Sequence, residues 1–170
     1  MRYQTFSNQE IYREKLLTEF PIEPPSGELF LTTDKSYGHE DDKELFLKQC
    51  SIFSRKKWTE INFDDAYELG ARWGPFPALS KLGEIYYLPA FLSYLYEVNN
   101  LDNGMIIDYF DNIFFSMTED KEVLDQFTVE QAKLIALCLV NLANLLDETD
   151  GAEKEYQKEL TSNWGHFLLF

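Results

Sequence analysis

The sequence predicts an all-α protein: a single-domain bundle of about six or seven helices around a central apolar helix. Apolar residues recur at helical spacing in several segments, which is the main signal for amphipathic helices. Helix-capping residues and prolines mark the boundaries between these segments. No two strand-like patterns pair with each other. At 170 residues and 45% hydrophobic content, the chain is long enough to fill one core.

The first helix and the loop after it are marked by local signals. Ser7 and Glu10 have the spacing of a capping box, so we expect a helix that continues to about Phe20. The breaker-rich stretch 21–27 (PIEPPSG) then predicts a loop. Residues 28–33 (ELFLTT) resemble a short strand, but a strand without a partner is not stable, so an extended loop is the prediction.

Two helices are expected in the region before residue 74. The acidic run 39–44 (HEDDKE) precedes an apolar stretch ending at Cys50, and acidic residues favour a helix N-terminus. Asn62 or Asp64 can cap a second, short helix that reaches about Leu69.

The next helix is expected to begin at a proline. Residues 74–77 (GPFP) break the chain, and Pro89 is a residue type that the first turn of a helix accepts. A helix starting there would end at Asn99 and Asn100.

The C-terminal third carries the clearest helical patterns. Apolar residues follow strict helical spacing over residues 106–117. Thr128 and Gln131 form a second capping box, with Phe127 placed to pack on the first turn. The helix that follows is apolar nearly all round, which is typical of the central helix of a bundle. A final helix is expected from about Asp150 to Trp164.

Charge and cysteine content limit the class of protein. The net charge is −15, so nucleic acid and anionic membranes are unfavourable partners. Cys50 and Cys138 are far apart in apolar surroundings and are expected to be buried free thiols. The N-terminus lacks the apolar stretch of a signal peptide, and no segment is long enough to span a bilayer. These features predict a soluble, cytoplasmic protein.

The sequence contains no pattern that indicates catalysis. Only His39 and His166 are present, and neither has a second ligand at metal-binding spacing. No phosphate-binding glycine motif and no nucleophile motif occurs. The basic cluster 55–57 precedes Trp58, but pairing with neighbouring acids is favoured over contact with nucleic acid. We therefore expect a non-enzymatic protein without cofactor or metal.

Two groups of residues are candidates for binding a protein partner. Tyr86 and Tyr87 are adjacent, and tyrosine is a common interface residue; the alternative is that both hydroxyls bond to nearby backbone. The acid-rich helix ends are the second group, because negative charge steers basic partners. The acidic candidates are Glu40, Asp41, Asp42, Asp147, Glu148 and Asp150.

The order of several short motifs resembles a bacterial family of small acidic domains of unknown function. The carrying residues are 58–61 (WTEI), 78–80 (ALS), 86–92 (YYLPAFL), 127–131 (FTVEQ) and Trp164. The resemblance covers residues 28–167. We expect residues 1–170 to form a single domain, in which residues 1–27 are an N-terminal helix and a Pro-rich loop. The resemblance assigns no activity. The chain is also similar to toxin-immunity proteins in its size, its acidity and its lack of enzymatic motifs. This second likeness is one of general type and rests on no shared motif.

The predicted function is a protein-binding domain, for example an inhibitor or immunity protein that binds a basic toxin. A helical scaffold or regulatory module in a larger assembly remains the alternative. An adjacent toxin gene would favour the first, and a buried polar pocket would favour an enzyme.

Overall fold

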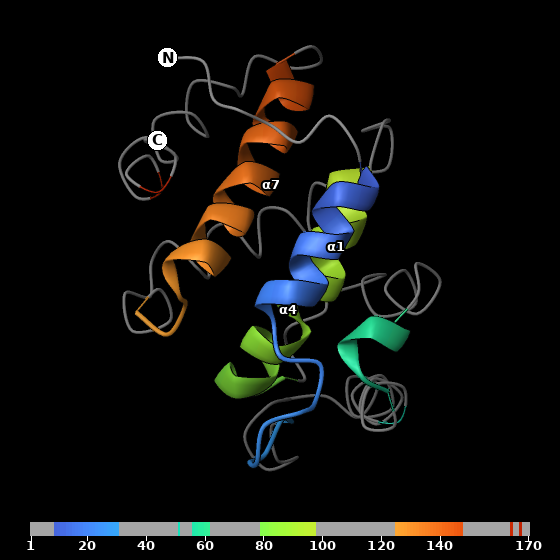
Figure 1. Ribbon diagram of the computed structural model, residues 1–170. Coiled ribbons are helices and arrows are strands. Elements are labelled where there is room, and N and C mark those ends of the chain that lie inside the picture. Colours follow the sequence, from blue (N-terminus) through green and yellow to red (C-terminus); the bar gives the residue numbers. More distant parts are fainter. Residues whose placement is uncertain are drawn as a thin grey trace, which may run out of the picture. The chain divides into compact units, whose positions relative to one another are not determined.

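A computed structural model of the chain describes residues 9–30, 51, 56–61, 79–97, 125–147, 164 and 167 (Figure 1). These residues hold the α-helices α1 (Gln9–Glu19), α4 (Lys81–Glu97) and α7 (Val129–Asp147) and the 3-10 turn η1 (Trp58–Glu60). An isolated antiparallel bridge joins Phe30 to Leu79. The part of the chain that is described is thus mostly helical.

The predicted all-α bundle of six or seven helices is wrong, because the described ranges hold three α-helices, one 3-10 turn and a β-bridge. The helices expected around residues 40–50, 62–69, 106–117 and 150–164 lie outside these ranges, apart from single residues. Cys50, His39 and His166 also lie outside them.

The chain divides into two compact units. Met1–Phe20 and Leu92–Phe170 form the first, and Pro21–Phe91 forms the second. The division falls inside α4, so this helix contributes residues to both units. The sequence-based boundary between residues 1–27 and 28–167 stays a prediction.

Helix α1 packs against α7 within the first unit (Figure 1). Tyr12 and Leu16, four residues apart on one face of α1, are buried. The side-chain amide of Gln131 donates a 2.8 Å hydrogen bond to the carbonyl of Glu19. That bond satisfies a carbonyl at the end of α1, where helical partners run out. The predicted helix end before Pro21 is confirmed, while Ser7 lies outside the described residues.

The start of α7 confirms the second capping box. The backbone N–H of Gln131 donates to the Thr128 hydroxyl at 3.2 Å, and the backbone N–H of Thr128 donates to the Gln131 side chain at 3.0 Å. Ala132 and all residues from 134 to 140 are buried, as the apolar pattern predicts for this helix. The ring of Phe127 meets Phe20 edge-on, with centroids 6.4 Å apart.

Helix α4 begins eight residues before Pro89. The prediction that this helix begins at Pro89 is therefore wrong. Ser80 acts as its N-cap, since the Ser80 hydroxyl accepts a 3.1 Å hydrogen bond from the backbone N–H of Gly83. The Ser80 hydroxyl also donates to the carbonyl of Glu28 at 2.5 Å. The backbone N–H of Ser80 donates to the carbonyl of Leu29 at 3.0 Å. Contacts with residues distant in sequence thus fix the helix start, and Pro89 lies within the helix.

None of the helices in the described ranges has the length and apolarity needed to cross a lipid bilayer.

Candidate functional site

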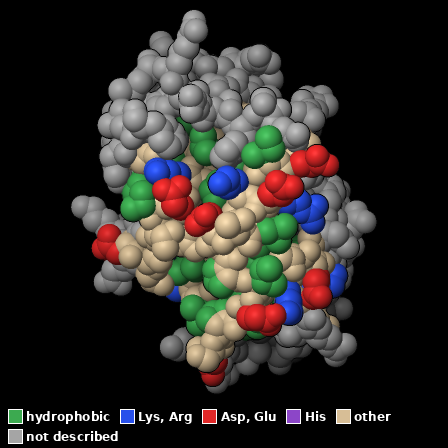
Figure 2. Space-filling model, viewed as in Figure 1, with side chains coloured by type: hydrophobic (Ala, Val, Ile, Leu, Met, Phe, Trp, Pro, Cys, Tyr) green, Lys and Arg blue, Asp and Glu red, His purple; other side chains and the backbone are tan. Residues whose placement is uncertain are grey.

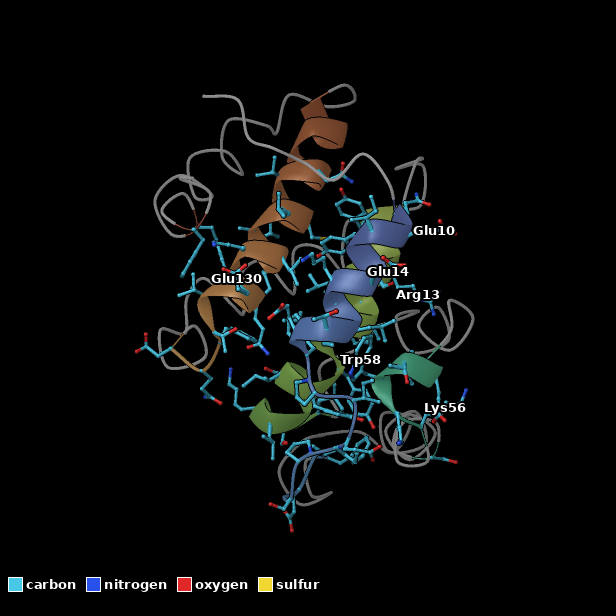
Figure 3. The ribbon with its side chains drawn as sticks, viewed as in Figure 1. Glu10, Arg13, Glu14, Lys56, Trp58 and Glu130 are labelled. Atoms are coloured by element: carbon cyan, nitrogen blue, oxygen red, sulfur yellow. The ribbon has the colours of Figure 1, made fainter. Side chains whose placement is uncertain are left out.

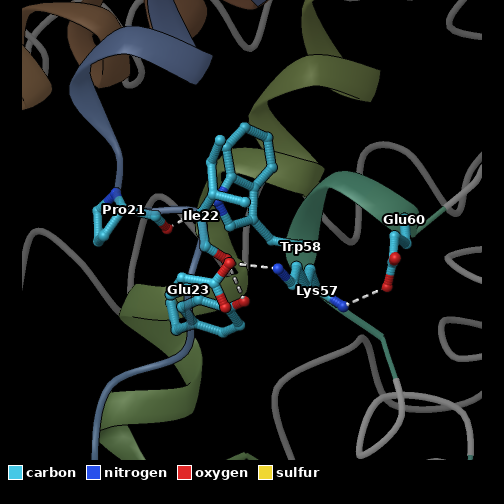
Figure 4. Close-up of polar contacts among 7 residues, drawn as sticks. Pro21, Ile22, Glu23, Lys57, Trp58 and Glu60 are labelled. Carbon is cyan, nitrogen blue, oxygen red and sulfur yellow. Dashed lines mark hydrogen bonds and ion pairs between the residues drawn. The ribbon is translucent and has the colours of Figure 1, made fainter.

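The turn η1 in the second unit is closed by a reciprocal pair of bonds between Lys57 and Glu60. The backbone N–H of Lys57 donates to the Glu60 carboxylate at 2.8 Å (Figure 4). The backbone N–H of Glu60 donates to the Lys57 carbonyl at 2.9 Å. This arrangement occupies a donor that the start of a helical turn otherwise leaves free. It also fixes the backbone from which the Lys57 and Trp58 side chains extend.

Three side chains bind three consecutive residues of the Pro-rich loop. The indole N–H of Trp58 donates to the carbonyl of Pro21 at 2.9 Å. The hydroxyl of Tyr86 donates to the carbonyl of Ile22 at 2.8 Å. The ammonium group of Lys57 forms an ion pair with the carboxylate of Glu23 (Figure 4). We call Lys57, Trp58 and Tyr86 the three donors, and residues 21–23 the 21–23 segment.

The 21–23 segment is exposed, whereas two of the donors are buried. Trp58 and Tyr86 are 3% and 4% exposed. Ile22 is 39% exposed, and the Glu23 side chain is 77% exposed. Backbone carbonyls and one carboxylate therefore hold the segment to η1 and α4 within the second unit, while its Ile22 and Glu23 side chains are exposed.

Both titratable donors keep their protons at neutral pH. Burial raises the pKa of the Tyr86 hydroxyl. The hydrogen bond to Glu23 raises the pKa of the Lys57 ammonium group. Because the ion pair is exposed, screening by water and salt limits its contribution to stability.

Tyr86 and Tyr87 are both buried, and neither presents much ring area to a partner. Their rings meet edge-on, with centroids 4.8 Å apart. The Tyr87 hydroxyl donates to the carbonyl of Lys56 at 3.1 Å. Both hydroxyls thus bond to backbone, but to segments distant in sequence and not to the nearby backbone that the alternative named. The acceptors lie 64 and 31 residues away, so sequence reasoning missed the 21–23 segment as the partner of Tyr86.

The acidic candidates are not brought together in the described residues. Asp147 is the last residue of α7. Glu40, Asp41, Asp42, Glu148 and Asp150 lie outside the described ranges. Other acids are exposed on the described elements, and the sequence did not single them out. These are Glu10 and Glu14 on α1, Glu23 and Glu28 in the loop, Glu60 in η1, and Asp125 and Glu130 at the start of α7.

Figure 3 shows Glu10, Arg13 and Glu14 extending from α1 and Glu130 from α7. In the space-filling view, acidic and basic side chains lie beside one another on the face shown (Figure 2). Glu130 pairs with Lys133 at 2.7 Å, for example. The described residues include eleven acids and six bases, so most of the chain's acidic excess lies elsewhere in the sequence. Periodicity places such acids on an outer helix face, and this signal could have found Glu10 and Glu14.

The first unit contains a buried group of two tyrosines and a thiol. Tyr12 stacks on Tyr96, with ring centroids 3.9 Å apart, and the Cys138 thiol donates to the carbonyl of Leu92 at 3.7 Å. Burial raises the pKa of Cys138 to about 12 and that of Tyr12 above its usual range. Because the thiolate is the reactive form, this environment suits packing and disfavours nucleophilic chemistry. The prediction that Cys138 is a buried free thiol is confirmed.

Neither metal binding nor base stacking finds support in the described residues. They contain no group of three or more His, Cys, Asp or Glu side chains that could hold a metal ion. The buried Trp58 ring has little free face on which a base could stack.

Comparisons with protein-family models, with curated proteins and with solved structures found no match to this chain. The resemblance to a bacterial family of small acidic domains therefore stays a prediction.

Proposed function

We propose that this chain is a protein-binding domain that associates with a basic protein. The observation that carries the proposal is the net charge of −15. Negative potential accelerates association with a positively charged partner and disfavours acidic ones. An inhibitor or immunity protein for a basic toxin is one specific form of this function.

The environment of the described acids supports the proposal. Glu10 and Glu14 on α1 and Asp125 near α7 are exposed, so their charges reach solvent. The groups with raised pKa values are tyrosines, a thiol and a lysine, each stabilised in its protonated form. General acid–base catalysis works best with a pKa near the operating pH, and these shifts move away from it.

The test begins with affinity capture from the organism that encodes the chain and continues with the purified partner. We expect a basic partner whose association rate falls steeply as salt rises, with a nearly constant dissociation rate, because salt screens charges beyond about 8–10 Å. A neutral or acidic partner, or an association rate that salt does not change, would contradict the proposal.

Two neighbouring residues of α1 provide matched variants. Glu14→Gln removes a negative charge and should slow association at low salt, whereas Lys15→Gln removes a positive charge and should accelerate it. Both side chains are exposed, so neither change should disturb the fold. Equal effects of the two variants would show that charge does not steer the encounter.

A further inference from the structure

We propose that Lys57, Trp58 and Tyr86 form a peptide-binding site for an extended segment with the pattern proline, apolar residue, acidic residue. In this chain the 21–23 segment occupies the site as an internal ligand, and a partner's segment of the same chemistry competes for it. This inference is independent of the proposed function, which concerns basic partners and surface acids.

The first argument is the way in which the contacts are distributed. Each of three consecutive residues is bound by a different side chain: the carbonyls of Pro21 and Ile22 by hydrogen bonds, and the carboxylate of Glu23 by an ion pair. In peptide recognition, main-chain hydrogen bonds provide affinity, and contacts to particular side chains provide specificity. Here the Lys57 ammonium group selects an acidic third residue.

The second argument concerns the aromatic donors and the proline. A segment that contains proline loses little entropy on binding, because its backbone is already restricted. Trp58 and Tyr86 provide an indole and a phenol, and each presents its polar hydrogen to the segment. Pro21 and Pro24 also have the P-x-x-P spacing of such ligands.

The third argument is that the side chains of the bound segment are exposed to solvent. The Ile22 and Glu23 side chains are exposed, while the rings of Trp58 and Tyr86 are buried. Two neutral hydrogen bonds and an exposed ion pair are individually weak contacts. Covalent attachment compensates for this, since it gives the internal segment an effective concentration in the range of about millimolar. Removing one internal contact should therefore increase the affinity of a competing peptide for the site.

The test uses the full chain and a labelled synthetic peptide with the sequence of residues 18–28, followed by fluorescence anisotropy. Glu23→Gln weakens the internal ligand at an exposed side chain and leaves the three donors intact. We expect this variant to bind the peptide about two- to fivefold more tightly than the wild-type chain. Pro21→Gly with Glu23→Gln should raise the gain to about tenfold, because glycine increases the entropy lost by the internal segment.

Specificity is tested by a double-mutant cycle. A peptide with glutamine in place of the glutamate that corresponds to Glu23 should bind the Glu23→Gln chain several-fold more weakly. Adding Lys57→Gln to the chain should remove this difference, whereas adding Lys56→Gln, at the neighbouring lysine, should keep it. Adding Tyr86→Phe, which retains the ring, should weaken peptide binding about two- to tenfold.

Direct contact is read in the wild-type chain by NMR. The indole N–H resonance of Trp58, assigned with Trp58→Phe, should shift at millimolar peptide and stay unchanged with a scrambled peptide. The proposal is overturned if the folded Glu23→Gln chain shows no saturable binding, or if Lys57→Gln leaves the preference for the acidic peptide intact. Glu14→Gln should leave peptide binding unchanged, which separates this site from charge-led association.

Discussion

The hydroxyl of Tyr12 donates a 2.7 Å hydrogen bond to the main-chain carbonyl of Leu134, which joins α1 to α7 across 122 residues of sequence. Both residues are buried, so water cannot replace this contact while the first unit is folded. Burial without a partner would be costly for the phenol, and the carbonyl provides that partner.

Tyr12→Phe should therefore lower the free energy of unfolding by about 0.5–1.5 kcal/mol, the net contribution of one such hydrogen bond. Urea unfolding followed by circular dichroism measures the change. Tyr12→Leu serves as a comparison, because it also removes the stacking on Tyr96 and should cost more. Equal stability of Tyr12→Phe and the wild-type chain would show that the bond contributes nothing.

Replacing a buried leucine of α7 with alanine should lower the free energy of unfolding far more than the same replacement at an exposed leucine of α1. Leu139 is 1% exposed and Leu17 is 40% exposed. Leu139→Ala and the similarly buried Leu137→Ala should each cost about 2–5 kcal/mol, since buried leucine truncation also leaves a cavity. Leu17→Ala should change stability by less than about 0.5 kcal/mol. Similar values at all three positions in denaturant unfolding would contradict the burial of α7.

Gly83→Ala should destabilise the protein, although alanine is favoured over glycine in most helices by about 1 kcal/mol. A Cβ atom at Gly83 would lie 2.0 Å from the carbonyl oxygen of Leu29, so the backbone would have to move. The bridge between Phe30 and Leu79 should weaken together with this contact. Thr18→Ala, at an exposed position of α1, is the control and should be neutral or stabilising. A more stable Gly83→Ala chain would show that the two segments separate easily.

Stability should fall at alkaline pH. Burial raises the pKa of Cys138 from 9.0 to about 12, so the folded state retains a proton that the unfolded state loses. Stability from this group is complete below about pH 9 and decreases as pH rises towards 12, by at most about 1.4 kcal/mol per pH unit.

Cys138→Ala isolates the contribution of this thiol, because the buried tyrosines also titrate in the alkaline range. Unfolding free energies measured from pH 8 to pH 11 should fall less steeply in the variant than in the wild-type chain. Parallel curves would indicate that the Cys138 thiol ionises equally well in the folded and unfolded states.

Local sequence signals determined where two of the described helices lie. Thr128 and Gln131 form the predicted capping box, and Pro21 follows the end of α1 as expected. These signals are reliable because a cap acts on backbone groups within one turn of helix. The buried middle of α7 also follows its apolar pattern, since a helix without a polar face must be covered on all sides.

Tertiary contacts decided what the local signals could not. Pro89 has the properties of a helix start, yet α4 begins after Ser80, because the carbonyls of Glu28 and Leu29 bind Ser80 there. Tyr86 and Tyr87 are of a residue type that is common at interfaces, yet their hydroxyls donate to backbone carbonyls 64 and 31 residues away. Propensity and spacing act over a few residues, whereas the acceptor that a buried hydroxyl meets depends on how distant segments pack. The same reason explains why the three donors around the 21–23 segment became visible only in three dimensions.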